Sequence, residues 1–543
     1  MRRFLQSAGQ VVETLCVENL LAVSGRSAGF NEANSLEYSQ RHAYLSMPDV
    51  LGTRENTDLC FDAGGGALLA AFGKAIGPLP PEADPPIDPE DKSPEAKAKR
   101  RDATMFKRLA SGGLLATWRL YRPDTPWAVM RCVGIPSCCL LPVAKPHLAF
   151  AGTEEGSIQI WNLREPGSSH PSVDIGNGDR LAVRAPTYAS DSLANVDSLA
   201  NTSTSAHMCA ISEIVALPVA SEDGELTIGS LDLEGTLILW VVLEQVEIDA
   251  SDLGQAVGGK ERLLRTATVP LTSLEAAAGG GVLPTRCFSM TFLPSDPSRL
   301  LLSTDLPQVL HRSRYTAPPG SPPAPPPTPH TFECISEQLT SCGATNVAFC
   351  PTSPNHFVSG RTDGSIALYH IEDGVPLLSW GGFNGGAAIT QVAWSGSRPA
   401  VFWALDSDGT LHAFNLLDST GKPFVSSKSH TDGGSPSRRR GGSTGGTGVT
   451  GGGGGMNGYA NGGSNGGGGG GGVGAAATRP KMRFALDQRA DGGKVGSAER
   501  LCAVSCRNPS GEPLGIEVHV LTETCATPQA DEAKKLAHFL KVL

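Results

Sequence analysis

The stretch FAGTEEGSIQIWNLRE at Phe150–Glu165 recurs along this chain in variant form and decides its fold. A short apolar strand ends at Gly152, a polar turn closes on Gly156, and a second strand ends at Trp161. Related copies occur at Ile228–Trp240 (IGSLDLEGTLILW), Val358–Tyr369 (VSGRTDGSIALY) and Phe402–Phe414 (FWALDSDGTLHAF). A hairpin that recurs along one chain predicts an all-β propeller, in which similar sheets are arranged radially around a central axis.

Two kinds of residue recur at fixed places in these hairpins. Each turn has a glycine after an acidic residue, because glycine adopts the positive φ of a tight turn without steric cost. The strand after the turn ends on an aromatic residue, at the place where WD repeats keep their tryptophan. We assign structural roles in the blades to Gly152, Gly156, Trp161, Gly235, Trp240, Gly364, Tyr369, Trp394, Gly409 and Phe414. Strict WD repeats also contain a histidine–aspartate network, which we expect to be mostly absent because no Gly-His pair precedes these hairpins.

Composition divides the chain of 543 residues into segments. The first segment, residues 1–35, has apolar side chains at helical spacing over residues 4–22, which predict a short helix that either packs on the propeller or docks to a partner. Two segments lack the apolar residues of a core, so we expect disordered inserts at the Pro-rich residues 77–107 and the Gly-rich residues 419–480. The remaining segments are 36–76 (first strands), 108–418 (WD40 blades) and 481–543 (last strands and a C-terminal helix).

The number of strand groups predicts a WD40-type propeller of seven blades, with six as the alternative. A closed ring removes the exposed sheet edges that make β proteins prone to aggregation. In such rings the last blade combines strands from both ends of the chain. We assign that blade to residues 36–75 and 499–521.

The composition argues against several other classes of protein. The net charge of −10 at pH 7 gives no general attraction to nucleic acid or to an anionic membrane. No apolar run is long enough to span a bilayer, and the N-terminal stretch lacks the pattern of a secretory signal. The 13 cysteines show neither a disulfide framework nor the spacing of zinc ligands. We therefore expect an intracellular protein without nucleic-acid binding or membrane insertion.

No motif of a catalytic or nucleotide-binding site is present. The chain lacks HExxH, GxxxxGK[ST], GxGxxG after a strand, and a GxSxG elbow. Acidic residues do gather in the hairpin turns, at Glu154, Glu155, Asp232, Glu234, Asp363, Asp406 and Asp408. Paired acids could hold a metal or transfer protons, but solvated turns favour acidic residues in any case. We predict a protein that is not an enzyme, with no catalytic residue, no cofactor and no metal.

Two irregular stretches between the hairpins carry a family resemblance. They are FLPSDP at 292–297 and WSGSRPAVF at Trp394–Phe402. Together with the hairpins, they resemble the propeller of the dynein intermediate chains, and most of all that of cytoplasmic dynein 2, the motor of retrograde intraflagellar transport. The resemblance covers about residues 4–417 and, more weakly, 499–543.

The resemblance implies a non-catalytic subunit whose propeller binds the tail of the dynein 2 heavy chain. It implies pairing with a second, different intermediate chain, and a location in the cytoplasm and in the cilium or flagellum, including the ciliary base. Light-chain binding is not carried over, because the family's light-chain sites lie in a long N-terminal region and here Met1 lies almost at the propeller.

The residues alone leave two other functions open. One is a generic WD40 scaffold or adaptor for another protein complex. The other is a propeller enzyme, which would need polar groups that converge in the central channel. The sequence does not identify the partner-binding surface.

Overall fold

The computed structural model of the chain contains a β-propeller. It describes residues 30–32, 36–45, 47–48, 51–76, 93, 104–105, 108–109, 111–176, 179–190, 207–217, 225–244, 259–272, 286–315, 327–334, 342–418, 421–428, 483–488, 500–507 and 513–543. The chain divides into two units, Met1–Thr431 with Pro480–Leu543 and Asp432–Arg479. All the described residues belong to the first unit.

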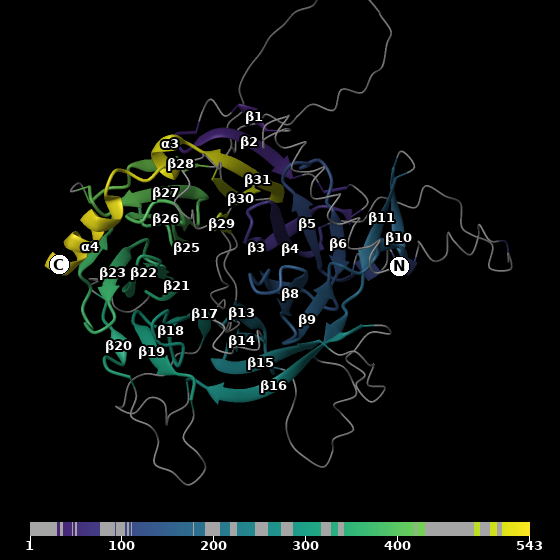
Figure 1. The fold of residues 1–543 in the computed structure, drawn as a ribbon, viewed down its shortest axis with the longest axis horizontal. Coiled ribbons are helices and arrows are strands. Elements are labelled where there is room, and N and C mark those ends of the chain that lie inside the picture. The colour runs from purple at the N-terminus through teal and green to yellow at the C-terminus, as the bar shows by residue number, and fades with distance from the viewer. Residues whose placement is uncertain are drawn as a thin grey trace, which may run out of the picture. The chain divides into compact units, whose positions relative to one another are not determined.

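Seven sheets form the blades, and they follow one another around a ring (Figure 1). We number the blades from the one that closes the ring. Blades 3 to 7 have four strands each, which pair in chain order. The first strand of a blade lies toward the centre and the last lies at the rim, as β25 and β28 show in Figure 1. This arrangement confirms the prediction of a seven-bladed WD40-type fold.

The strands of the four-stranded blades have the following bounds. Blade 3 contains β7 (Pro136–Leu140), β8 (Leu148–Thr153), β9 (Ile158–Asn162) and β12 (Tyr188–Ala189). Blade 4 contains β13 (Ile211–Ala216), β14 (Leu226–Asp232), β15 (Thr236–Glu244) and β16 (Glu261–Pro270). Blade 5 contains β17 (Cys287–Phe292), β18 (Arg299–Thr304), β19 (Val309–Ser313) and β20 (Thr331–Phe332). Blades 6 and 7 contain β21 (Ala344–Cys350), β22 (Ser353–Arg361), β23 (Ile366–His370), β24 (Leu378–Trp380), and β25 (Ile389–Trp394), β26 (Val401–Asp406), β27 (Thr410–Asn415), β28 (Val425–Lys428).

Blade 1 closes the ring with strands from N-terminal and C-terminal segments of the sequence. Its strands are β29 (Phe484–Leu486), β30 (Leu501–Arg507), β31 (Pro513–Leu521), β2 (Ser39–Leu45) and β1 (Asn31–Glu32). β2 pairs antiparallel with β31, with Leu45 opposite Ile516. The ring is therefore closed by hydrogen bonds and packing between segments far apart in the sequence.

Blade 2 contains N-terminal strands that the sequence placed in the closing blade. Its strands are β3 (Arg54–Phe61), β4 (Ala67–Ala75), β5 (Leu114–Arg119), β6 (Ala128–Arg131), β11 (Asp179–Arg184) and β10 (Ser172–Gly176). β4 pairs with β5, with Ala67 opposite Arg119, so residues 54–75 belong to blade 2. The prediction that all of 36–75 joins the closing blade is wrong, because β3 and β4 pair with the strands that follow residues 77–107 along the chain.

The Gly-rich insert predicted for 419–480 begins later than expected. β28 lies within that range and forms the outer strand of blade 7, where it pairs with β27 and Thr410 faces Lys428. An outer strand is half exposed, so backbone pairing rather than apolar composition defines it. Most of the predicted inserts and the helix predicted within residues 1–35 lie outside the described residues.

Two short α-helices follow β31, α3 (Glu523–Ala526) and α4 (Glu532–Val542). α4 places Leu536 and Leu540, four residues apart, on one face. Both belong to a buried cluster with Trp380 of blade 6 and Phe402 of blade 7. Within the described part of the chain, no helix combines the length and the apolar character needed to cross a membrane.

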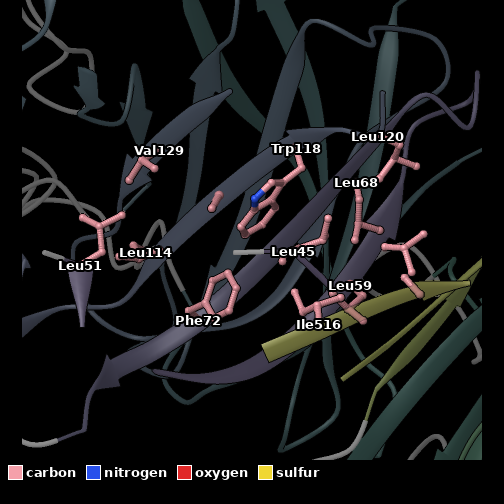
Figure 2. Close-up of a cluster of buried hydrophobic side chains, with 14 of the residues drawn as sticks. Leu45, Leu51, Leu59, Leu68, Phe72, Leu114, Trp118, Leu120, Val129 and Ile516 are labelled. Atoms are coloured by element: carbon pink, nitrogen blue, oxygen red, sulfur yellow. The ribbon is translucent and has the colours of Figure 1, made fainter. Parts of the chain in front are cut away.

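The hydrophobic core lies in layers between adjacent blades. Both faces of a blade are covered by its neighbours, so its strands are almost continuously apolar. Figure 2 shows one layer, in which Trp118 lies among Leu45, Leu68 and Phe72. Ile516 of blade 1 belongs to the same layer as these side chains from blades 1 and 2. Packing of this kind joins each blade to the next.

Candidate functional site

The connections between strands lie at two ends of the propeller. Strand direction alternates within a blade. The turns between the second and third strands and the connections to the next blade therefore lie at the same end, which we call the turn end. The connections from the first to the second strand and from the third to the fourth strand lie at the opposite end, which we call the loop end. The repeated turn glycines Gly156, Gly235, Gly364 and Gly409 have φ of 85°, 86°, 81° and 83°, the left-handed region that glycine adopts freely. All four lie at the turn end.

The aromatic residues predicted to close these hairpins lie in the core. They are Trp161, Trp240, Tyr369 and Phe414, which are at most 2% exposed. Trp394 ends β25 and donates from Nε1 to the carbonyl oxygen of Ala348 in the neighbouring blade, at 3.0 Å. Gly152 lies where blades 3 and 4 approach closely, because an added Cβ would lie 2.7 Å from Cγ2 of Ile211. The predicted residues therefore lie in turns, in the buried core and at a close approach between blades.

Blade 4 contains a complete buried histidine–aspartate network, which the sequence analysis missed. Nδ1 of His207 lies 3.0 Å from Oδ2 of Asp232, and Nε2 lies 2.7 Å from Oγ of Ser230. Nε1 of Trp240 donates to the same Ser230 oxygen at 2.8 Å. The expectation that the network is mostly absent is therefore wrong for this blade. The histidine follows an alanine rather than a glycine, which hid the usual dipeptide.

Blade 7 contains a related network, formed by its last three strands. Oδ1 of Asp406 accepts from the backbone N–H of Thr410 at 2.8 Å and fixes the turn. Oδ2 of Asp406 lies 3.1 Å from Nε2 of His412, which comes from the third strand of the same blade. Nδ1 of His412 lies 2.9 Å from Oγ of Ser426 in β28. Asp406 occupies the same position in its blade as Asp232 in blade 4. The histidine differs, because His412 lies in the third strand whereas His207 precedes the first strand of its blade.

Blade 3 keeps the tryptophan but has lost its polar partners. Trp161 occupies the place of Trp240, while Ala151 and Thr153 stand where blade 4 has Ser230 and Asp232. Nε1 of Trp161 is buried without a hydrogen-bond partner among the described residues. The two tryptophans therefore differ in hydrogen bonding while sharing a buried position.

Because of this difference, replacing each of the two tryptophans by phenylalanine should lower the free energy of unfolding by different amounts. Trp240→Phe is expected to lower the free energy of unfolding by about 1 kcal/mol more than Trp161→Phe, because only Trp240 loses a buried hydrogen bond. Urea unfolding of both variants, followed by circular dichroism, measures the difference. Equal costs would show that the bond to Ser230 adds no stability.

Side chains near the central axis link the first strand of every blade to its neighbour. In ring order from the junction of blades 1 and 2, the links are Arg483 Nε to Thr57 O (3.2 Å), Cys139 N to Asp58 Oδ2 (2.8 Å), Ser137 Oγ to Ile211 O (2.5 Å), Met290 N to Glu213 Oε2 (2.6 Å), Asn346 Nδ2 to Ser289 Oγ (3.1 Å), Val392 N to Asn346 Oδ1 (3.1 Å) and Phe484 N to Gln391 Oε1 (3.0 Å). We call these side chains the collar. The sequence signal for them, which we missed, is a polar residue in the middle of a mainly apolar first strand, such as Glu213 in ISEIVA and Gln391 in ITQVAW.

The collar bears on the possibility of a propeller enzyme. Catalysis in the channel would need polar groups that converge on a substrate. Asp58, Glu213 and Gln391 instead accept hydrogen bonds from the backbone of the next blade. These side chains take part in closing the ring.

The WSGSRPAVF motif anchors the C-terminal helices at the loop end. Arg398, in the connection from β25 to β26, places Nε 3.3 Å from Oε2 of Glu532 and donates from Nη1 to the carbonyl oxygen of Thr524 at 2.5 Å. Glu532 also accepts from the backbone N–H groups of Ala400 at 3.2 Å and Gln529 at 2.7 Å. The Arg398 and Glu532 side chains are only 4% and 1% exposed, so the ion pair is buried.

The FLPSDP motif forms the connection between β17 and β18, also at the loop end. Oδ1 of Asp296 accepts from the backbone N–H of Ser298 at 3.0 Å, and Oδ2 lies 3.3 Å from Nε of Arg299. Hydrogen bonds from Ser298 lower the pKa of Asp296. This motif therefore fixes a tight connection on the surface.

Acidic residues of the turns accept hydrogen bonds from the backbone of turns and connections at the turn end. Oε2 of Glu155 accepts from Ile135 N at 3.0 Å, and Oδ1 of Asp363 accepts from Ser365 N at 2.9 Å. Among the described residues, no three His, Cys, Asp or Glu side chains gather as a metal site requires. The described cysteines are free thiols, and burial raises the pKa of Cys60 and Cys287 to about 12. Thiols with such high pKa values are poor nucleophiles.

The fold and its links define a class of protein, the seven-bladed WD40-type propellers. No family model matches the chain. It is 30% identical over 325 residues to cytoplasmic dynein 2 intermediate chain 1 of Homo sapiens, a match that covers 57% of this chain and 30% of that one. It is 24% identical over 329 residues to cytoplasmic dynein 2 intermediate chain 2 of Mus musculus, covering 59% and 54%.

These similarities confirm the resemblance inferred from the hairpins and the two motifs. The chain is similar to cytoplasmic dynein 2 intermediate chains of both kinds over 57–59% of its length. The matches span about a third of the length of intermediate chain 1 and about half of that of intermediate chain 2.

Proposed function

We propose that this chain is a non-catalytic intermediate-chain subunit of the cytoplasmic dynein 2 motor. The observation that carries the proposal is the 30% identity to intermediate chain 1 over 325 residues. Both motifs that carry the family resemblance are built into the fold, one as the anchor of the C-terminal helices and the other as a tight connection. A closed ring of seven blades is a rigid body suited to docking on an elongated partner.

In this role the propeller binds the tail of the dynein 2 heavy chain and works beside a second, different intermediate chain. The relatives are of two kinds, intermediate chain 1 and intermediate chain 2, which supports a motor with two different propellers. The assembly serves retrograde intraflagellar transport and cilium assembly. The chain is accordingly placed in the cytoplasm, at the ciliary base and along the cilium.

Deletion of the gene in ciliated cells tests the role of the chain in transport. Retrograde particles tracked by fluorescence microscopy should become rare, and train proteins should accumulate at the ciliary tip. The wild-type chain should restore return traffic, as should Lys534→Ala, which changes a side chain that is 85% exposed. Normal return traffic after deletion would contradict the proposal and favour a generic WD40 scaffold of another complex.

A further inference from the structure

The connection from the third to the fourth strand of blade 2, at the loop end, carries aromatic and basic residues, of which Arg122 and Trp127 are exposed and Arg119 and Tyr121 are half-buried. Cζ of Arg119 lies 4.4 Å from the ring centre of Trp127, and Nη1 of Arg119 donates to the hydroxyl of Tyr121 at 3.1 Å. Trp127 is 40% exposed, whereas the other six tryptophans are at most 8% exposed. We call Arg119, Tyr121 and Trp127 the Trp127 platform.

The backbone around the platform is fixed independently of its side chains. Trp127 N donates to Thr117 O at 2.7 Å, and Leu120 N donates to Gly66 O at 2.9 Å. A turn bond from Arg122 N to Arg119 O, at 2.8 Å, holds the tip between them. The tip therefore keeps its shape through main-chain bonds, and the exposed indole is not needed to form it.

The neighbouring blade adds further support beside the platform. The connection from β9 to β12 in blade 3 forms the hairpin β10–β11, and β11 pairs in parallel with β6 of blade 2. Val183 lies opposite Val129, two residues after Trp127. Blade 2 is thereby widened to six strands next to the platform. A preorganised surface loses less conformational entropy when it binds a partner.

The chemistry of the tip favours carboxylate groups. Within residues 119–127 there are two arginines, Arg119 and Arg122, and one acid, Asp124. A guanidinium group binds a carboxylate through two parallel hydrogen bonds, and the face of an indole packs against apolar or proline side chains. Tryptophan, tyrosine and arginine are also the residues that dominate the energy of protein interfaces.

We propose that the Trp127 platform is an interaction surface for an acidic, extended segment of a protein partner. Carboxylates of the segment pair with Arg122, and an apolar or proline side chain covers the ring of Trp127, which Arg119 supports from beside it. The inference does not depend on the dynein 2 role, because it rests on the geometry and charge of this tip alone.

Binding of a simple acidic peptide to the purified full chain tests the proposal. The probe is a fluorescein-labelled peptide of five Glu-Pro repeats, and the matched probe has Gln in place of each Glu. Fluorescence anisotropy should show binding of the acidic peptide at least about tenfold tighter than that of the neutral one. Trp127→Ala and Arg119→Ala should each weaken binding by at least about tenfold.

Tyr315→Ala is the matched control, because Tyr315 is also exposed and also lies near an arginine, with Arg314 Cζ 5.1 Å from its ring centre. This variant should bind the acidic peptide as the wild type does. Arg122→Glu, a charge reversal at an exposed site, should abolish binding while leaving the unfolding midpoint unchanged. Because Arg122→Glu should remain folded, it tests the proposal even if Trp127→Ala or Arg119→Ala fails to fold.

Three results would overturn the proposal. The first is equal binding by the wild type and Trp127→Ala when both are folded by circular dichroism. The second is equal affinity for the two peptides. The third is a dimer in analytical ultracentrifugation that Trp127→Ala dissociates, because the platform would then bind a second copy of the chain.

Discussion

Replacing Arg398 by alanine is expected to lower the free energy of unfolding by about 3–5 kcal/mol, because it leaves the buried Glu532 charge without its partner. The two side chains are 4% and 1% exposed, so water cannot solvate the remaining carboxylate. The substitution also removes the hydrogen bond from Arg398 to Thr524, which holds the connection to α3. The C-terminal helices should be the first part of the unit to detach.

Urea unfolding followed by circular dichroism measures the cost, and two variants sharpen the result. Lys534→Ala breaks an exposed ion pair with Asp531, whose side chains are 85% and 63% exposed, and should cost less than about 1 kcal/mol. Removing both Arg398 and Glu532 should cost less than the sum of the two single changes, because neither charge is then left unpaired. A cost for Arg398→Ala no greater than that for Lys534→Ala would contradict the buried anchor.

Trp403→Ala is expected to lower the free energy of unfolding by about 3–5 kcal/mol, because it leaves a cavity in the layer between blades 7 and 1. Trp403 lies in β26 and is fully buried. Its ring packs edge-on against Tyr38, which precedes β2, with ring centres 6.1 Å apart. The same cluster contains Cys502 and Val504 of β30. The cavity therefore lies next to blade 1, in which N-terminal and C-terminal segments pair to close the ring.

Thermal unfolding of Trp403→Ala and of Trp127→Ala compares the loss of a buried tryptophan with the loss of an exposed one. Trp127 is 40% exposed, so its removal should change the free energy of unfolding by about 0.5 kcal/mol or less. Trp403→Ala should in addition lose near-ultraviolet signal cooperatively at a lower temperature. Similar midpoints for the two variants would show that blades 7 and 1 do not depend on this layer.

The sequence revealed the hairpins because local rules govern them. A tight turn needs a glycine with positive φ, and Gly156 and Gly364 have φ of 85° and 81°. The strand after each turn must fill a buried layer, which explains Trp161 and Tyr369 at the same distance from those glycines. Such signals lie within about a dozen residues, so a single sequence displays them.

Pairings between distant segments were not visible in the sequence. Arg398 and Glu532 are 134 residues apart, and Ser39 and His519, whose Oγ and Nδ1 lie 3.1 Å apart, are separated by 480. β3 and β4 were assigned to the closing blade because nothing local distinguishes pairing with β31 from pairing with β5. The collar was missed because its polar residues look like interruptions of apolar strands until their backbone partners in the next blade are known.

Affinity purification of the tagged chain from ciliated cells, followed by mass spectrometry, tests the assignment to dynein 2 most directly. The wild-type chain and the Lys534→Ala control should both recover the dynein 2 heavy chain together with a different intermediate chain. Arg398→Ala should recover less of both, because its propeller is destabilised. Reproducible recovery of another complex, with no dynein heavy chain from either the wild type or the control, would contradict the assignment.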